Sequence, residues 1–355
     1  MDMAILICKM PVRLLTGIFL LLSMNACRND RADIRHIFVD SISCSFDGAS
    51  LYNNCRAVYG FTTLHMGNNI YMCCMEDDST ILKCDILGNK KTDTIAITGG
   101  HVRSLGSTDS TLYLVCNYRN LHQIHFKADS PVIVERSVTL LPSLFNDSLF
   151  ISAGTGTNLI PLTDNKLLIP FGAINETLSY LDTNAYIMTS VGDSGSYTAI
   201  VRHPPEFLTT YEYFTASISD YNKTNNCLYY TFNKKEYLYR LNIHTRRLDS
   251  VLLKGFTKTA FDQDKMQSFT YIRSYIYQND KNCKIICDND KVFLIVRDHN
   301  KQYVINAFSS DLKLLSSTKI NNDIFPEMAF IKDHQLYAPL HDHRLLRVII
   351  TDNRM

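Results

Sequence analysis

Seven basic side chains are the residues of this 355-residue chain with the clearest capacity to bind a ligand. Guanidinium and imidazolium groups recognise oxyanions because they combine positive charge with several N–H donors. If these side chains converge on one opening, they favour an anionic ligand. The alternative is that each is a solvated loop side chain. The candidates are Arg103, Arg119, Arg202, Arg273, Arg297, His341 and His343.

His341 and His343 also have the spacing that puts two imidazoles on one face of a strand, as a metal site requires. No third or fourth ligand is visible in the sequence, and His122 and His125 are no better placed. The tripeptide Asp288–Asp290 begins like a calcium loop but lacks the glycine and the distal glutamate. A hairpin turn explains it. We therefore predict neither a metal site nor a cofactor.

The stretch Gly192–Gly195 (GDSG) copies the nucleophile motif of trypsin-like proteases. That chemistry also needs a positioned histidine and a buried aspartate. The sequence has no matching histidine motif, and the stretch falls in a long predicted loop. No P-loop, G-x-S-x-G elbow or H-E-x-x-H motif occurs either. The sequence therefore favours binding over catalysis.

The first residues have the composition of an export signal. Lys9 and Arg13 give a basic start, and Leu14–Met24 is an apolar run too short to span a bilayer. Cys27 directly follows the small residue Ala26, which resembles the bacterial lipobox, although Met24 stands where that motif usually has leucine. We expect residues 1–26 to be a lipoprotein signal peptide and 27–33 a tether carrying a lipid such as palmitate on Cys27. The alternative is an ordinary cleaved signal with a chance cysteine.

Charge and cysteine content narrow the function further. The net charge is +1, and no basic run occurs, so nucleic acid is not an expected partner. The chain has 11 cysteines, yet their spacing shows no disulfide framework. Several lie in apolar runs, so we expect them to be buried as small hydrophobic side chains. Disulfide pairing in an oxidising compartment is the alternative.

Short apolar strands separated by Asn, Asp, Gly and Ser pairs fill the rest of the chain, which is typical of an all-β fold. A four-stranded unit is clearest at 61–97; it recurs four times and is followed by an incomplete sixth unit. The second strands of the units start at Ile70, Leu112, Leu167, Cys227, Val292 and Leu336. These starts are 42, 55, 60, 65 and 44 residues apart. A quasi-period near 40–50 residues with four strands per unit is typical of a β-propeller.

Two of the predicted units depend on weaker patterns. The third uses Leu159–Thr163, Leu167–Phe171, Leu178–Asp182 and Tyr186–Val191, and the fifth joins Ser274–Tyr277 to Lys284–Cys287 as its first strand. The sixth unit has three strands only. We expect Ile34–Ile42 to pair beside Arg344–Thr351 and complete it, which removes exposed edges. The prediction is a six-bladed β-propeller over 34–355; two packed β-sandwiches are the alternative.

With its lipobox, six units and this length, the chain resembles the TolB-like six-bladed propeller lipoproteins of Bacteroides-type bacteria. The resemblance implies a fold and a cell-envelope location, with the outer membrane expected, rather than an activity. We expect a binding or scaffold module for a protein or an anionic glycan. Its binding face carries the turns between second and third strands and the long links 141–158, 192–214 and 254–273. A glycan hydrolase or lyase with its site in the central funnel is the alternative.

Overall fold

The computed structural model describes the chain in separate ranges. They are 36–43, 61–66, 69–74, 80–85, 93–97, 102–108, 110–116, 120–127, 130–132, 138–139, 149–151, 158–162, 165–173, 184–190, 197–202, 217–265, 268–321, 323–340 and 344–351. The predicted signal peptide, Cys27 and the tether lie outside them, as does the GDSG stretch.

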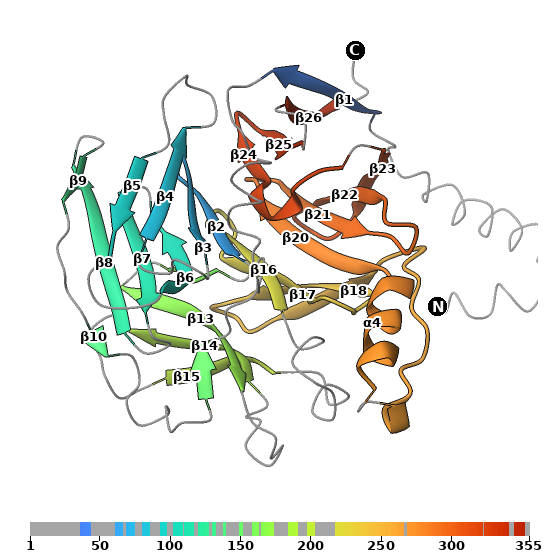
Figure 1. Cartoon of the computed structure of the whole chain (residues 1–355), viewed down its shortest axis with the longest axis horizontal. Helices are drawn as coiled ribbons and strands as arrows, with labels where there is room; N and C mark the ends of the chain where they lie inside the picture. The colour runs from blue at the N-terminus through green and yellow to red at the C-terminus, as the bar shows by residue number, and fades with distance from the viewer. Residues whose placement is uncertain are drawn as a thin grey trace, which may run out of the picture.

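The described strands form six antiparallel sheets that follow one another along the chain and are arranged about a common centre (Figure 1). The first has the order β2–β3–β4–β5 and the second is β6–β7–β8, with β9 and β10 both paired to β8. Their bounds are β2 Phe61–Met66, β3 Asn69–Cys74, β4 Thr80–Asp85, β5 Asp93–Ala96, β6 Val102–Ser107, β7 Thr111–Cys116, β8 Asn120–Lys127, β9 Ser130–Val132 and β10 Val138–Thr139.

In the third sheet β11 and β12 both pair with β13, which is followed by β14 and β15. The fourth sheet is a simple meander from β16 to β19. The bounds are β11 Leu149–Ile151, β12 Ile160–Pro161, β13 Lys166–Ala173, β14 Asn184–Ser190, β15 Tyr197–Arg202, β16 Ser217–Asn222, β17 Cys227–Phe232, β18 Tyr237–Asn242 and β19 Leu248–Leu252.

A 3-10 helix and an α-helix, η4 and α4, precede the fifth sheet, and the 3-10 helix η5 precedes the sixth. The fifth sheet is β20–β21–β22–β23, and the sixth has the order β24–β25–β26–β1. The bounds are η4 Gln263–Lys265, α4 Phe269–Gln278, β20 Lys281–Cys287, β21 Lys291–Arg297, β22 Tyr303–Ser309, β23 Leu314–Ile320, η5 Pro326–Met328, β24 Phe330–Lys332, β25 Gln335–Pro339, β26 Arg344–Thr351 and β1 His36–Ser43.

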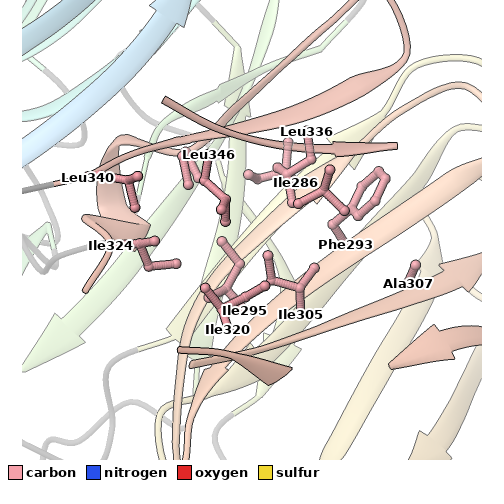
Figure 2. Packing of buried hydrophobic residues seen from close by; sticks show 13 residues of the cluster. Ile286, Phe293, Ile295, Ile305, Ala307, Ile320, Ile324, Leu336, Leu340 and Leu346 are labelled. Atoms are coloured by element: carbon pink, nitrogen blue, oxygen red, sulfur yellow. The ribbon is translucent and has the colours of Figure 1, made fainter. Parts of the chain in front are cut away.

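The hydrophobic core is divided into layers, each lying between neighbouring sheets. β17 is buried at every position, because its two faces contact different neighbours: Leu228 and Tyr230 pack towards the third sheet and Tyr229 towards the fifth. Figure 2 shows the layer between the fifth and sixth sheets, where Ile295 of β21 packs with Leu346 of β26. Burying such side chains contributes about 25 cal/mol per Å² of apolar surface. The chain is an all-β β-propeller.

The expected pairing between the two ends of the chain is confirmed. β1 runs antiparallel to β26 in full register, from His36 opposite Thr351 to Ser43 opposite Arg344. β1 thereby becomes the outermost strand of the sixth sheet, and Val39 packs against the hydrophobic layer shown in Figure 2. Without β1, the hydrogen-bonding edge of β26 would be open to solvent or to another chain.

The third unit differs from its prediction. Tyr186–Val191 was expected to be its fourth strand, but β14 covers 184–190 and pairs directly with β13, so it is the third. The fourth is β15, Tyr197–Arg202, which falls in the predicted inter-blade link. The predicted strand Leu178–Asp182 lies outside the described residues. The error arose because the segment 192–214 begins with polar and glycine residues, which hid the alternation in Tyr197–Arg202.

The fifth unit also differs, because Ser274–Tyr277 belongs to the helix α4 and not to a strand. Tyr and Ile favour strands in sequence patterns. Here Ile272, Tyr275 and Ile276 recur at helical spacing and contact the core between the third and fourth sheets. Ser268 caps the helix by accepting a hydrogen bond from the Tyr271 N–H at 3.2 Å. Tertiary packing and a capping residue outweighed the local strand preference.

Two smaller expectations are confirmed. Among the described cysteines, Cys116, Cys227 and Cys283 are buried as expected, whereas Cys287 is only partly buried. Asp288–Asp290 forms the hairpin turn between β20 and β21, with the Asp288 N–H donating to the Lys291 carbonyl at 2.8 Å. Within the described part of the chain, no helix is long and apolar enough to cross a membrane.

Deleting Ile34–Ile42 from the full chain should lower Tm by at least about 5 °C, since the loss of a paired strand costs several kcal/mol. Differential scanning calorimetry measures the change. Val39→Asp should act in the same direction, because it puts a charge against the apolar layer of the last two sheets. A truncated chain that melts like the parent would contradict the role assigned to β1.

Candidate functional site

Helix α4 lies outside the sheets, beside β17, β18 and β20 (Figure 1). It is attached by an aromatic cluster in which the Phe261 ring meets the rings of Tyr271 and Tyr275 at centroid distances of 5.6 and 5.0 Å. Tyr275 and Ile272 are buried in the layer between the third and fourth sheets. This packing fixes one side of the helix and leaves the side with Arg273 and Tyr277 exposed.

The end of α4 is held by a buried lysine. Lys234, in the turn between β17 and β18, is 3% exposed, and its ammonium donates to the carbonyls of Ile276, Asn279 and Asp280, each at 3.0 Å. These carbonyls belong to the last turn of the helix and the residues after it, where unpaired acceptors and the helix dipole both favour a cation. Burial lowers the pKa of Lys234 to about 7, with Arg297 and Lys281 adding repulsion. The three carbonyl acceptors match the three N–H donors of the charged ammonium, and they therefore oppose the lowering of its pKa.

Two polar residues after the helix tie it to other loops. Asn279 donates to the Tyr275 carbonyl at 2.7 Å, and its own side-chain oxygen accepts from the Thr259 N–H at 2.5 Å. The Asp280 carboxylate accepts from the backbone N–H groups of Thr257 and His299 at 2.8 and 2.7 Å. Asp280 therefore joins the segment before α4 to the β21–β22 turn, and both are held against the end of the helix.

Three cations surround one exposed tyrosine at this junction. Tyr277 is 45% exposed, and its ring centroid lies 5.9 Å from the Arg273 guanidinium, 5.7 Å from that of Arg297 and 5.9 Å from the Lys301 ammonium. Arg273 comes from α4, Arg297 from the end of β21, and Lys301 from the turn after it. We call Arg273, Tyr277, Arg297 and Lys301 the α4 corner. Each cation–π contact contributes about 0.5–1 kcal/mol at an exposed position.

The α4 corner has a local excess of positive charge. None of its three cations forms an ion pair with a described residue, and the Arg297 Nε is buried without a hydrogen-bond partner. The nearby Asp280 carboxylate is engaged by two backbone N–H groups and by the His299 ring at 3.0 Å. An oxyanion placed on the corner would therefore meet donors that no described carboxylate neutralises.

The structure brings together two of the seven predicted ligand-binding residues, Arg273 and Arg297, at the α4 corner. Arg202 ends β15 and is exposed, and Arg103 lies within β6. Arg119, His341 and His343 lie outside the described residues. Arg273 was expected in a loop that enters a blade, and it lies on a helix instead.

Sequence reasoning missed Tyr277 and Lys301. Tyr277 was assigned to a strand, so its relation to Arg273 one helical turn earlier was hidden. The available signal was the capping serine Ser268, followed by Arg273 and Tyr277 at a spacing of four residues, which places both on one face of a helix. Lys301 lies in the β21–β22 turn with a φ of 66°, and nothing in its local sequence indicated its contact with a distant tyrosine.

The α4 corner lies on the face that the sequence analysis singled out for binding. Its parts are an inter-blade link and a turn between the second and third strands of the fifth sheet. Lys234, which positions it, belongs to the corresponding turn of the fourth sheet. Such turns lie at one end of all the sheets in a propeller.

Replacing Lys234 with Met should destabilise the protein by about 3 kcal/mol, because three carbonyls would lose their buried donor. Urea unfolding of the full chain measures this change. Lys313→Met is the matched control: Lys313 is exposed in the β22–β23 turn, so its replacement should change stability by less than about 0.5 kcal/mol. Equal effects of the two substitutions would refute the role of Lys234.

This chain resembles solved structures in its fold. No family model matches the sequence, and no curated protein matches it either. A solved structure of a DUF4221 family member from Bacteroides vulgatus superposes with a TM-score of 0.62 and 12% identity, covering 90% of this chain and 99% of that one. A protein of Bacteroides fragilis described as exported gives 0.53 and 12%, covering 90% and 96%. The chain shares their overall architecture, that of an all-β propeller.

Proposed function

We propose that this protein is a lipid-anchored binding module of a bacterial cell envelope, and that it binds an anionic glycan at the α4 corner. The observation that supports this ligand class is a group of three cations around the exposed ring of Tyr277, none of which forms an ion pair with a described residue. A sugar ring can pack its C–H face on tyrosine while its carboxylate or sulfate pairs with guanidinium groups.

The anchor rests on the first residues of the sequence. A basic start, an apolar run and the Ala26–Cys27 pair form the pattern of a lipoprotein signal, and the polar residues after Cys27 supply a tether. In this proposal the tether holds the propeller close to the membrane, with the outer membrane as the expected site. The anchor and the ligand site are separate claims and can fail independently.

The scaffold is proposed to be a closed ring of six blades in the TolB-like manner. Six sheets in chain order, hydrophobic layers between neighbouring sheets and the pairing of β1 with β26 support this proposal. A closed ring is a rigid support for loops, because each sheet is fixed by two neighbours. Rigidity suits the α4 corner, whose cations come from helix α4, strand β21 and the turn after β21.

Cys27→Ser should abolish incorporation of a palmitate analogue by cells that express the full chain. The protein should also move from the membrane fraction to the soluble fraction, because one thioether-linked lipid provides the anchor. Metabolic labelling followed by carbonate extraction measures both. A variant that still labels, or that stays with the membranes after extraction, would rule out the proposed anchor.

Replacing both Arg273 and Lys301 with Gln should weaken binding to dextran sulfate about three- to ten-fold, as expected for two exposed charge contacts. The loss should shrink as salt rises and screens the charges. Tm should hardly change, since both side chains are exposed. Biolayer interferometry with the full chain in detergent measures the affinities.

Two comparisons make this test specific. Lys313→Gln removes an exposed charge away from the corner and should leave binding unchanged, and neutral dextran should not bind the parent protein. Tyr277→Leu should weaken binding to dextran sulfate but less than the double substitution. If the parent binds an acidic peptide such as polyglutamate and ignores dextran sulfate, the glycan assignment is wrong.

A further inference from the structure

A cavity of about 280 Å³ lies among the innermost strands, away from the α4 corner. Its lining comes from five of the six sheets, including Ser107 of β6, Ile160 of β12, Asp220 of β16, Lys284 of β20 and Phe330 of β24. In β16 and β20 the lining residues are the later part of the strand, next to the turns 223–226 and 288–290. The cavity thus lies towards the short-turn face, opposite the face that carries the α4 corner.

Lys284 is the unusual residue of this cavity. It is 9% exposed, and its ammonium makes no hydrogen bond or ion pair with any described residue. Lys234 shows the contrast, since its buried ammonium has three carbonyl acceptors. Burial lowers the pKa of Lys284, and the charges of Asp220 and Glu327 act in the opposite direction. A buried cation without a direct partner costs stability, so its presence requires a compensating role.

Asp220 faces the same space but is already engaged. Its two carboxylate oxygens accept the N–H groups of Tyr221 and Cys287 at 2.8 and 2.7 Å. Burial raises its pKa, while these two hydrogen bonds and the charges of Lys284 and Lys223 lower it. Asp220 therefore fixes β16 against β20 through backbone groups, and it leaves the donors of Lys284 available to another acceptor.

The rest of the lining suits a small molecule with polar and apolar parts. Ser219 lines the cavity, and its hydroxyl interacts with the buried hydroxyl of Tyr186. Ile286, Met328 and Phe330 supply apolar surface. A hydrophobic wall with a few placed polar groups is the usual make-up of a small-molecule site.

We propose that this central cavity binds a small molecule bearing a carboxylate or phosphate group, with the Lys284 ammonium as its direct partner. The ligand oxyanion supplies the acceptor that no described residue provides, and the apolar wall holds the remainder of the molecule. This site is independent of the α4 corner, so neither the glycan nor the lipid anchor is needed for it.

Isothermal titration calorimetry of the full chain with inorganic phosphate, citrate and glucuronate tests the proposal. At least one probe should bind with a Kd below about 1 mM, a range that a few charge-assisted contacts can supply. Lys284→Met should weaken that binding at least about ten-fold. Binding should also weaken as pH rises, at a pH below that of an ordinary lysine, with Asp220 and Glu327 the carboxylates that face the ammonium.

A thermal melt separates a ligand-binding lysine from a structural one. Lys284→Met should keep or raise Tm, because it removes a desolvated charge that no described residue pairs. Lys234→Met, where the ammonium has three acceptors, should lower Tm and leave probe binding intact. The proposal is overturned if none of the three probes binds the parent, or if Lys284→Met lowers Tm as Lys234→Met does.

Discussion

Central strands that are apolar on both faces impose the main constraint on this fold. β17 and β21 are buried along almost their whole length, so each needs a hydrophobic neighbour on both sides. A two-layer sandwich covers one face of a sheet and leaves the other to solvent. Sheets stacked around a centre satisfy every central strand in turn, as the layers between successive sheets show. The radial arrangement thus follows from strand composition, and the pairing of β1 with β26 follows from the need to cover the last edge.

The same constraint means that backbone polar groups need hydrogen-bond partners wherever the chain leaves the sheets. Asn282 shows how this is done within the core: its side-chain nitrogen donates to the carbonyls of Phe232 and Lys235 at 2.9 and 2.7 Å and joins the fourth and fifth sheets. Lys234 does the same for the end of α4. Among the described residues, by contrast, the side-chain oxygen of Asn282 and the buried Nε of Arg297 have no hydrogen-bond partner. The ammonium of Lys284 likewise has no direct partner among them. Unsatisfied polar groups in a well-packed protein are where function is to be sought.

The sequence was most informative where periodicity alone decides structure. The start of β17 at Cys227 and the bounds Arg344–Thr351 were placed to the residue, because mostly apolar runs with Asn or Asp nearby are typical of strands between turns. It failed at α4, where Tyr and Ile suit a strand locally and only contacts with distant sheets select the helix. The two halves of the α4 corner show the same limit. Arg273 and Arg297 were recognised as candidates by residue type, but their meeting over Tyr277 depends on the buried Lys234, whose role has no local signal.

The two proposed sites differ in how the fold supports them. At the α4 corner, Lys234, Asn279 and Asp280 fix the elements that carry the exposed cations. Because water screens these charges, exposing them costs little stability. In the central cavity the cation is desolvated, and its interaction with an oxyanion is stronger because the surroundings are less polar. Extended surfaces of charge suit a polymer that makes many weak contacts, and a buried charge suits one small molecule held by few. A propeller provides both arrangements, since loops gather on its faces and the innermost strands meet at its centre.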